Sequence, residues 1–300
     1  MAEDLSTPLA GELIAAAALG HVPAFAAQRA VITRLPGGSV NRTYSVCTSA
    51  GRFVLRLSPA PDAWLATDRS VEHALHALAA DAGLAPRIVH ADPRDRWLIT
   101  EFVAGPVWTD ASFASVECLE ALGDALRRLH AIAPPAAGRF DLLQALTAYV
   151  RRLGRAPAPE QSAPLQGYLE QAVSAWQLSG ATERRLAVLH HDLHGSNLID
   201  SPRGLVLIDW ECAAVNDPLL DVACVLSYFE AARTHAEVLL RRSGLGAVTG
   251  RQLAAAVWLF DLHTWWWYRE RGMRRAPTPA EVAAEARLAE AVARGIPSAP

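Results

Sequence analysis

The sequence contains no lysine: all 28 of its Lys and Arg residues are arginines. A chain without lysine cannot form a Schiff base with pyridoxal phosphate, and it cannot supply the lysine of a Walker A phosphate-binding loop. Any phosphate group that the protein binds must therefore meet arginine, a metal ion or backbone N–H groups.

The sequence also has few cysteines, no long apolar run and only a small net charge. The four cysteines, Cys47, Cys118, Cys212 and Cys224, match no zinc pattern, and we expect them to be buried, unbridged side chains. No run of about 18 apolar residues is present to span a membrane, and the N-terminus lacks the positive flank of a signal peptide. The net charge of −3 shows no basic bias toward nucleic acid or anionic membranes. We therefore expect a cytoplasmic protein that binds neither nucleic acid nor membranes.

What the sequence does contain is enough apolar material for a large core. Of its 300 residues, 51% are hydrophobic and 20% are charged, a composition that disfavours disorder. The first third carries strand signals and two helical patterns. The expected helices cover 8–19 and 68–81, and the expected strands cover 31–35, 43–47, 52–57, 86–90 and 96–103. A short turn containing Gly51 joins the second and third strands, which predicts an antiparallel hairpin.

The rest of the chain is mainly helical in pattern. Helices are expected over 114–132, 142–153, 164–178, 219–243 and 252–272, with a further Ala/Glu-rich helix after 276. One short β-like pair, 187–190 and 204–209, interrupts them. The predicted class is α+β: a small lobe with a five-stranded antiparallel sheet over residues 1–103, and a larger, mainly helical lobe over 104–300.

The segment from Leu189 to Trp210, LHHDLHGSNLIDSPRGLVLIDW, carries the clearest chemical pattern. Phosphoryl transfer from a nucleotide needs a group that orients or deprotonates the attacking hydroxyl, and oxygen ligands that hold Mg²⁺ on the phosphates. Asp192 suits the first task. Asn197, five residues later, and Asp209, twelve further on, supply hard oxygen ligands of the kind that Mg²⁺ prefers.

This pattern resembles the catalytic loop of the protein-kinase-like superfamily. The form HxDLHxxN followed by IDWE is similar to the aminoglycoside phosphotransferase and choline/thiamine kinase group, and closest to its bacterial choline and thiamine kinases. The resemblance extends over roughly residues 31–268. It implies a bilobal protein-kinase-like fold, ATP and Mg²⁺ as cofactors, and catalytic roles for His190, Asp192 and His194.

The same resemblance assigns the nucleotide side of the site. A glycine-rich loop between the first two strands would approach the phosphates, Arg56 stands where the superfamily usually has lysine, and Glu72 is its expected partner. Backbone groups near Glu101 and Val103 would meet the adenine. The residues implied to bind the nucleotide are Gly37, Gly38, Ser39, Asn41, Arg56, Glu72, Glu101 and Val103.

Substrate choice is indicated by Glu211 and by the aromatic segment VWLFDLHTWWWY, residues 257–268. Trp265, Trp266 and Trp267 must point in different directions on a helix, so core packing is expected for most of these rings. One of them, Trp265, is a candidate for binding an organic cation through its ring face. The acceptor is therefore expected to be a small cationic alcohol such as thiamine or choline. An antibiotic phosphotransferase and a catalytically silent nucleotide-binding scaffold are the alternatives.

Overall fold

The computed structural model describes residues 8–23, 25, 28–36, 41–58, 68–154 and 163–296. The chain divides into two compact units. The first unit comprises Met1–Val107 and Asn197–Cys212, and the second comprises Trp108–Ser196 and Ala213–Pro300. The first unit is thus built from two separate stretches of chain. The division into lobes at 1–103 and 104–300 stays a prediction.

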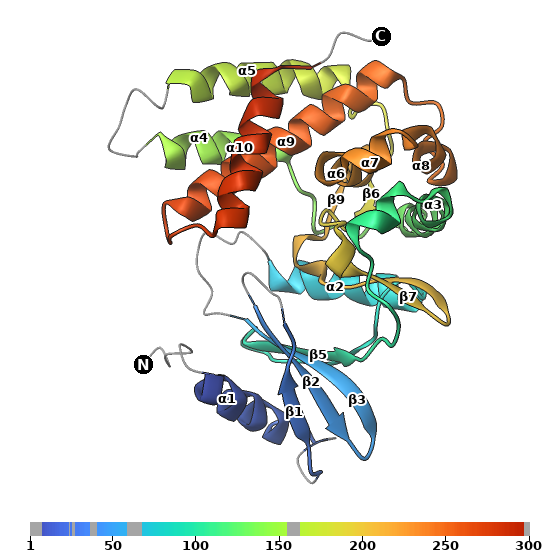
Figure 1. The fold of residues 1–300 in the computed structure, drawn as a ribbon, viewed down its shortest axis with the longest axis vertical. Coiled ribbons are helices and arrows are strands. Elements are labelled where there is room, and N and C mark those ends of the chain that lie inside the picture. Colours follow the sequence, from blue (N-terminus) through green and yellow to red (C-terminus); the bar gives the residue numbers. More distant parts are fainter. Residues whose placement is uncertain are drawn as a thin grey trace. The chain divides into compact units, whose positions relative to one another are not determined.

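The first unit is organised around a sheet. Within its described residues the sheet has five antiparallel strands in the order β1-β2-β3-β5-β4 (Figure 1). The strands are β1 (Val31–Arg34), β2 (Arg42–Thr48), β3 (Gly51–Leu57), β4 (Ile88–Ala91) and β5 (Trp97–Glu101). The predicted hairpin is confirmed, because Thr48 pairs with Gly51 at the turn between β2 and β3.

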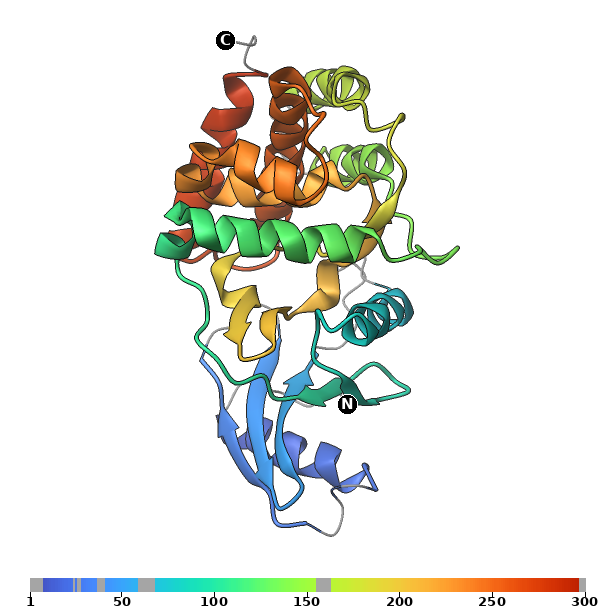
Figure 2. The ribbon, with the colours of Figure 1, turned by 90° about the vertical axis from the view of Figure 1, so that its right-hand side faces the viewer.

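Side-chain alternation gives this sheet two different faces. Helix α1 (Pro8–Gly20) packs on one face, and α2 (Arg69–Asp81) lies on the other side (Figure 1 and Figure 2). Leu55 and Leu57 of β3 are buried in the apolar cluster under α1. Because successive strand residues point to opposite faces, Arg56 between them points toward α2.

The second stretch of the first unit is a hairpin followed by a tight turn. Strands β7 (Leu198–Ser201) and β8 (Gly204–Leu207) pair antiparallel, and a short 3-10 helix covers Trp210–Cys212. The hairpin joins the rest of the unit through a bridge between Val107 and Ile199. Gly105 has φ +154°, and an added Cβ there would lie 2.0 Å from the Asp200 carbonyl oxygen, so this close approach requires glycine.

The second unit is mainly helical. Its helices are α3 (Val116–His130), α4 (Leu142–Leu153), α5 (Ala163–Leu178), α6 (Leu219–Tyr228), α7 (Glu230–Arg233), α8 (Ala236–Arg242), α9 (Gly250–Gly272) and α10 (Pro279–Ala293). A two-stranded antiparallel ribbon pairs β6 (Ala187–Leu189) with β9 (Ala214–Asn216). Together with the sheet of the first unit, this content confirms the predicted α+β class.

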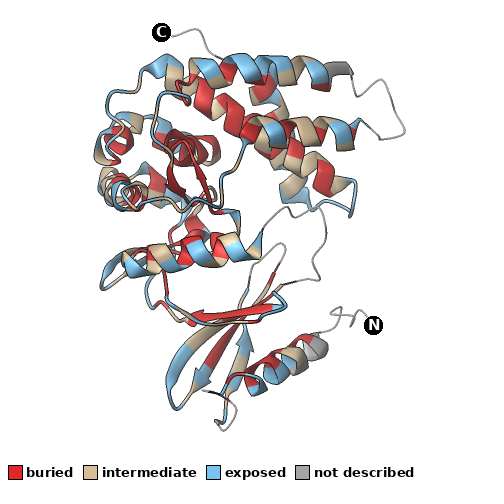
Figure 3. Cartoon of the chain, turned by 180° about the vertical axis from the view of Figure 1, so that it is seen from behind, coloured by how far each residue is buried: buried red, intermediate tan, exposed pale blue. Residues whose placement is uncertain are grey.

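Helix α9 forms the centre of the helical core. It packs against α4, α5, α6 and α10, and buried positions run along most of its length (Figure 3). Trp258 and Trp266 are buried in this core, and Trp265 is 9% exposed. The expectation that most rings of 257–268 serve packing is therefore confirmed.

Three local expectations were wrong. The single helix expected over 219–243 is three helices: Phe229 has extended backbone angles (φ −124°, ψ 103°) that end α6, and His235 has non-helical angles (φ −119°, ψ 22°) between α7 and α8. The β-like runs 187–190 and 204–209 do not pair with each other: β6 pairs with β9, which lies beyond β8 in the sequence, and β8 pairs with β7. Of the cysteines, Cys224 is buried, but Cys47 and Cys212 are exposed; all four are free thiols, as expected.

The described residues include no helix that combines the length and apolar character needed to cross a bilayer.

Candidate active site

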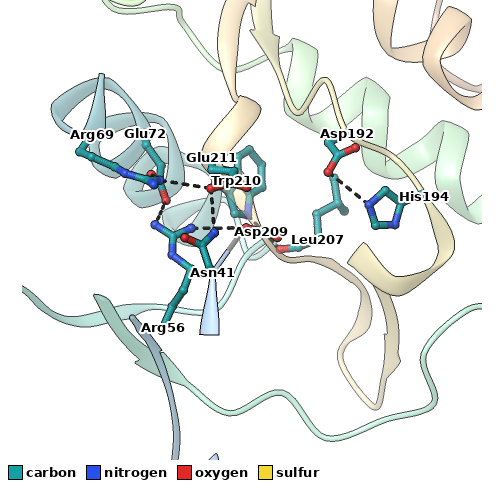
Figure 4. Close-up of polar contacts among 10 residues, drawn as sticks. All are labelled: Asn41, Arg56, Arg69, Glu72, Asp192, His194, Leu207, Asp209, Trp210 and Glu211. Atoms are coloured by element: carbon teal, nitrogen blue, oxygen red, sulfur yellow. Dashed lines mark hydrogen bonds and ion pairs between the residues drawn. The ribbon is translucent and has the colours of Figure 1, made fainter. Parts of the chain in front are cut away.

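The first unit holds a cluster of charged side chains on the α2 side of its sheet (Figure 4). Arg56 extends from β3 and its guanidinium meets two carboxylates: Nη2 lies 2.5 Å from Glu72 Oε1, and Nη1 lies 3.3 Å from Asp209 Oδ1. The predicted pairing of Arg56 with Glu72 is therefore confirmed. Burial lowers the pKa of Arg56, but the surrounding carboxylates outweigh burial and hold its pKa above the ordinary value, so the group stays charged.

Glu72 is the buried centre of this cluster. It lies in the first turn of α2, whose N-cap is Asp68, and it is 1% exposed. Its second oxygen, Oε2, lies 2.5 Å from Arg69 Nη1, so each carboxylate oxygen has its own guanidinium. Burial alone would raise the pKa of Glu72, but Arg56 and Arg69 outweigh it and hold the pKa below the ordinary value. Glu72 is thus ionised and shared by two arginines.

Asp209 and Glu211 stand on either side of a buried anchor. Between them, Trp210 is fully buried, and its indole Nε1–H donates to the Leu207 carbonyl at 3.0 Å. Its ring stacks on His76 of α2, with centroids 5.9 Å apart. Asp209 has φ +63°, a left-handed conformation that is uncommon for a residue other than glycine. The anchor and the tight turn together hold the Asp209 backbone in place.

Glu211 completes the cluster. Its Oε2 accepts from Asn41 Nδ2 at 2.8 Å and from Arg69 Nη1 at 3.4 Å (Figure 4). Arg69 therefore joins Glu72 on α2 to Glu211 in the turn after β8. Sequence reasoning did not single out Arg69. The signal was available, because Arg69 and Glu72 are three residues apart on a helix, the spacing at which opposite charges meet.

Asn197 lies in the same unit, immediately before β7. It is 3% exposed, and its carbonyl accepts from the Ile208 N–H at 2.9 Å, which ties it to the strand that leads into Asp209. Among the described residues, no group of three or more His, Cys, Asp and Glu side chains forms a ready-made metal cage. Mg²⁺ is commonly held by one or two protein oxygens together with phosphates and water. The amide of Asn197 and the carboxylate of Asp209 fit that kind of site.

The expected adenine-binding segment follows β5. Val103 is 8% exposed and belongs to an apolar cluster with Ile199 and Val206, against which Ile208 packs. Glu101 pairs with Arg87 at 2.6 Å. The nucleotide roles of both residues stay predictions. Gly37, Gly38 and Ser39 lie outside the described residues.

In the second unit, the loop after β6 carries His190, Asp192 and His194. Asp221 on α6 accepts from the backbone N–H groups of His190 (3.2 Å) and His191 (2.8 Å), and His130 Nε2 lies 3.0 Å from its Oδ2. Burial alone would raise the pKa of Asp221, but the contacts with His130 and His191 hold it below the ordinary value. Asp221 thus holds the backbone of this loop.

The Asp192 side chain is itself held on both oxygens. His194 Nε2 lies 3.2 Å from Oδ2 (Figure 4), and the Tyr228 hydroxyl donates to Oδ1 at 3.4 Å. His190 is fully buried, and its Nδ1 accepts from the Asp192 N–H at 3.3 Å. Sequence reasoning missed Tyr228, although its position seven residues after Asp221 places it on the same helix face.

Trp265, the substrate candidate on α9, has a packing role in the structure. Its ring meets Tyr168 edge-on, with centroids 5.5 Å apart, and the Arg269 guanidinium lies 5.5 Å from the ring centroid. Its role in substrate binding stays a prediction.

Known proteins share both the sequence pattern and the fold. A model of the phosphotransferase enzyme family matches residues 31–256. The thiamine kinase of Salmonella paratyphi B is 30% identical to this chain over 214 residues, which cover 71% of each protein. A choline/ethanolamine kinase family protein from Mesorhizobium loti matches with a TM-score of 0.77 and 24% identity over 94% of each chain. Choline kinase LicA from Streptococcus pneumoniae matches with a TM-score of 0.78 and 20% identity, covering 95% of this chain and 99% of that one.

Proposed function

Because this chain belongs to the phosphotransferase enzyme family and is a kinase-type phosphotransferase, we propose that it moves the γ-phosphoryl group of ATP to a hydroxyl of a small cationic alcohol. Thiamine is the first candidate acceptor, and choline is the second. The observation that carries the proposal is the contact of Arg56 with both Glu72 and Asp209. It puts a permanent cation beside a carboxylate suited to Mg²⁺ in a chain that has no lysine.

In this proposal the first unit handles the nucleotide. Asn197 and Asp209 would hold Mg²⁺, which when bound offsets the charge that develops on the phosphates. Arg56 would bind the α- and β-phosphates as a planar, bidentate donor in place of the usual lysine. The apolar side chains of Val103 and Ile208 would contact the adenine ring. Glu72 supports this role because it fixes the guanidinium from the buried side.

The second unit supplies the group that acts on the acceptor. Asp192 would accept the proton of the substrate hydroxyl while the oxygen bonds to the γ-phosphorus and the bond to the ADP oxygen breaks. His190 and His194 would hold the loop and the carboxylate in position. Support comes from the contacts of Asp192 with His194 and of the loop backbone with Asp221.

The choice of thiamine rests on one finding and one chemical argument. The Salmonella thiamine kinase is 30% identical to this chain over 71% of both proteins. A cationic alcohol would also be attracted by a carboxylate such as that of Glu211.

The test is ADP release with Mg²⁺ and ATP across thiamine, choline, ethanolamine, kanamycin, homoserine and a sugar. Asp192→Asn is the inactive variant, and Asp200→Asn is its matched control, since Asp200 is an exposed residue with the same chemistry. We expect turnover on thiamine or choline that persists in the control and falls at least 100-fold in Asp192→Asn.

Other outcomes identify the alternatives. Turnover on kanamycin alone would make the protein an antibiotic phosphotransferase. ATP binding without turnover on any acceptor would make it a nucleotide-binding scaffold. Near-normal activity of Asp192→Asn would overturn the mechanism itself.

A further inference from the structure

One face of α6 contacts the Asp192 loop at three places. Asp221, Cys224 and Tyr228 are spaced three and four residues apart, so their side chains lie on the same side of the helix. Asp221 accepts from the loop backbone at His190 and His191. The helix therefore follows the loop along its length rather than contacting it at one end.

The three contacts differ in what they hold. Cys224 is buried, and its Sγ accepts from the Leu193 N–H at 3.2 Å, so both Asp221 and Cys224 fix the loop backbone. Tyr228 reaches the Asp192 carboxylate itself, with its hydroxyl 3.4 Å from Oδ1. Of the three side chains, Tyr228 thus touches the group that the proposed mechanism uses.

The Tyr228 ring is held in turn by its aromatic neighbours. Phe260 of α9 meets it edge-on at 5.7 Å between centroids, and Phe229 does so at 6.2 Å. The His194 ring lies edge-on at 6.1 Å. Because the ring is packed in this way, the position of its hydroxyl is fixed, and the hydroxyl can orient the carboxylate that it contacts.

The two oxygens of Asp192 are therefore oriented from two directions. Tyr228 contacts Oδ1 and His194 Nε2 lies 3.2 Å from Oδ2, while His194 Nδ1 lies 2.7 Å from the Ser196 hydroxyl. An ionised carboxylate has about four acceptor sites, divided between its two oxygens. Fixing both oxygens sets the direction in which those sites point.

We propose that Tyr228 is a positioning residue for phosphoryl transfer: its hydroxyl turns the Asp192 carboxylate toward the acceptor. The inference rests on the function proposed above. It predicts an effect on the transfer step and none on nucleotide binding, because orientation of a reacting group contributes to the barrier of the chemical step.

The experiment compares Tyr228→Phe with Tyr168→Phe in the full chain. Both changes remove one hydroxyl from a partly buried ring of the second unit, and Tyr168 packs on Trp265. We expect Tyr228→Phe to lower kcat about tenfold, with KM for ATP within twofold, and Tyr168→Phe to leave kcat unchanged. A loss of kcat below threefold overturns the inference.

A double-mutant cycle tests whether Tyr228 acts through Asp192. In the Asp192→Asn background, Tyr228→Phe should cause no further loss of residual turnover, since the group that it positions is gone. An equal fold-loss in both backgrounds would assign Tyr228 a structural role and overturn the inference.

A spectroscopic measurement separates this inference from the proposed function. The ¹³Cγ resonance of Asp192, assigned by its absence in Asp192→Asn, should move in Tyr228→Phe and stay in place in Tyr168→Phe. Wild-type protein that turns over no acceptor would refute the proposed function, whereas an unmoved Asp192 resonance would refute the role of Tyr228 whatever the activity.

Discussion

Glu72→Gln tests the charged cluster of the first unit most directly. The substitution keeps the shape of the side chain but removes the charge that Arg56 and Arg69 share. One amide oxygen can still accept from one arginine, while the amide NH₂ faces the other. Removing one partner of a buried ion pair typically costs about 3–5 kcal/mol. Because Glu72 is 1% exposed, we expect a loss of unfolding free energy of about 3 kcal/mol.

Urea denaturation at pH 7, followed by circular dichroism and tryptophan fluorescence, measures this loss. Glu290→Gln is the matched control: Glu290 pairs with Arg294 four residues away, and both side chains are more than 60% exposed. An exposed helix pair of this kind contributes about 0.3–0.5 kcal/mol. A loss below about 1 kcal/mol for Glu72→Gln, or equal losses for both variants, would refute the reasoning.

The same variant has a predicted pH signature. The pKa of Glu72 lies below its ordinary value of 4.5 in the folded protein. Its stabilisation is therefore complete above pH 4.5 and is lost as the pH falls through the lower folded value. The difference in unfolding free energy between wild type and Glu72→Gln should accordingly narrow below pH 4.5. A difference that stays constant across this window would contradict ionisation of Glu72.

Three further changes extend the test. Gly105→Ala should destabilise the protein by about 1–3 kcal/mol, because its Cβ would lie 2.0 Å from the Asp200 carbonyl oxygen; an unchanged urea midpoint would contradict this. Burial lowers the pKa of His76 from 6.5 to about 4. Between these pH values the unfolded chain binds a proton that the folded protein does not, so the unfolding free energy of wild type should fall by about 3 kcal/mol as the pH is lowered from 6.5 to 4. His76→Gln should remove that loss, measured as unfolding free energy at pH 7 and pH 4. Asp221→Asn should lower kcat at least about tenfold; normal steady-state turnover in a folded variant would show that the loop needs no such support.

Local patterns predicted most of the fold because the relevant signals are short-range. The strand alternation around Arg56 and the hairpin turn at Gly51 were sufficient for the antiparallel sheet. The break at Phe229 was not predictable from periodicity, since apolar residues continue at helical spacing on both sides while its backbone is extended. Pairing of β7 with β8 was missed because residues 198–201 have no distinctive alternation.

The site residues also divide into those that the sequence predicted and those that only the structure reveals. Arg56, Glu72 and Asp209 followed from motif spacing and family resemblance, and the structure brings them together. Arg69 has a local signal in its spacing to Glu72, but its contact with Glu211 spans 142 residues of sequence, and the contact of Tyr228 with Asp192 spans 36. A single sequence does not reveal which residues so far apart along the chain come into contact. Asn41 was expected to meet phosphate, and its contact with Glu211 came from the structure alone.

The discontinuous first unit has a consequence for biosynthesis. Residues 1–107 leave the ribosome first. Arg56 pairs with Asp209 and Arg69 with Glu211, and both carboxylates belong to the stretch 197–212, which is synthesised later. At about 5–20 residues per second, the intervening chain takes roughly 5–20 s to synthesise. During that interval the sheet carries two arginines whose later partners do not yet exist. A fragment ending at Val107 would lack these partners permanently, so the first unit should be produced together with residues 197–212 of the same chain.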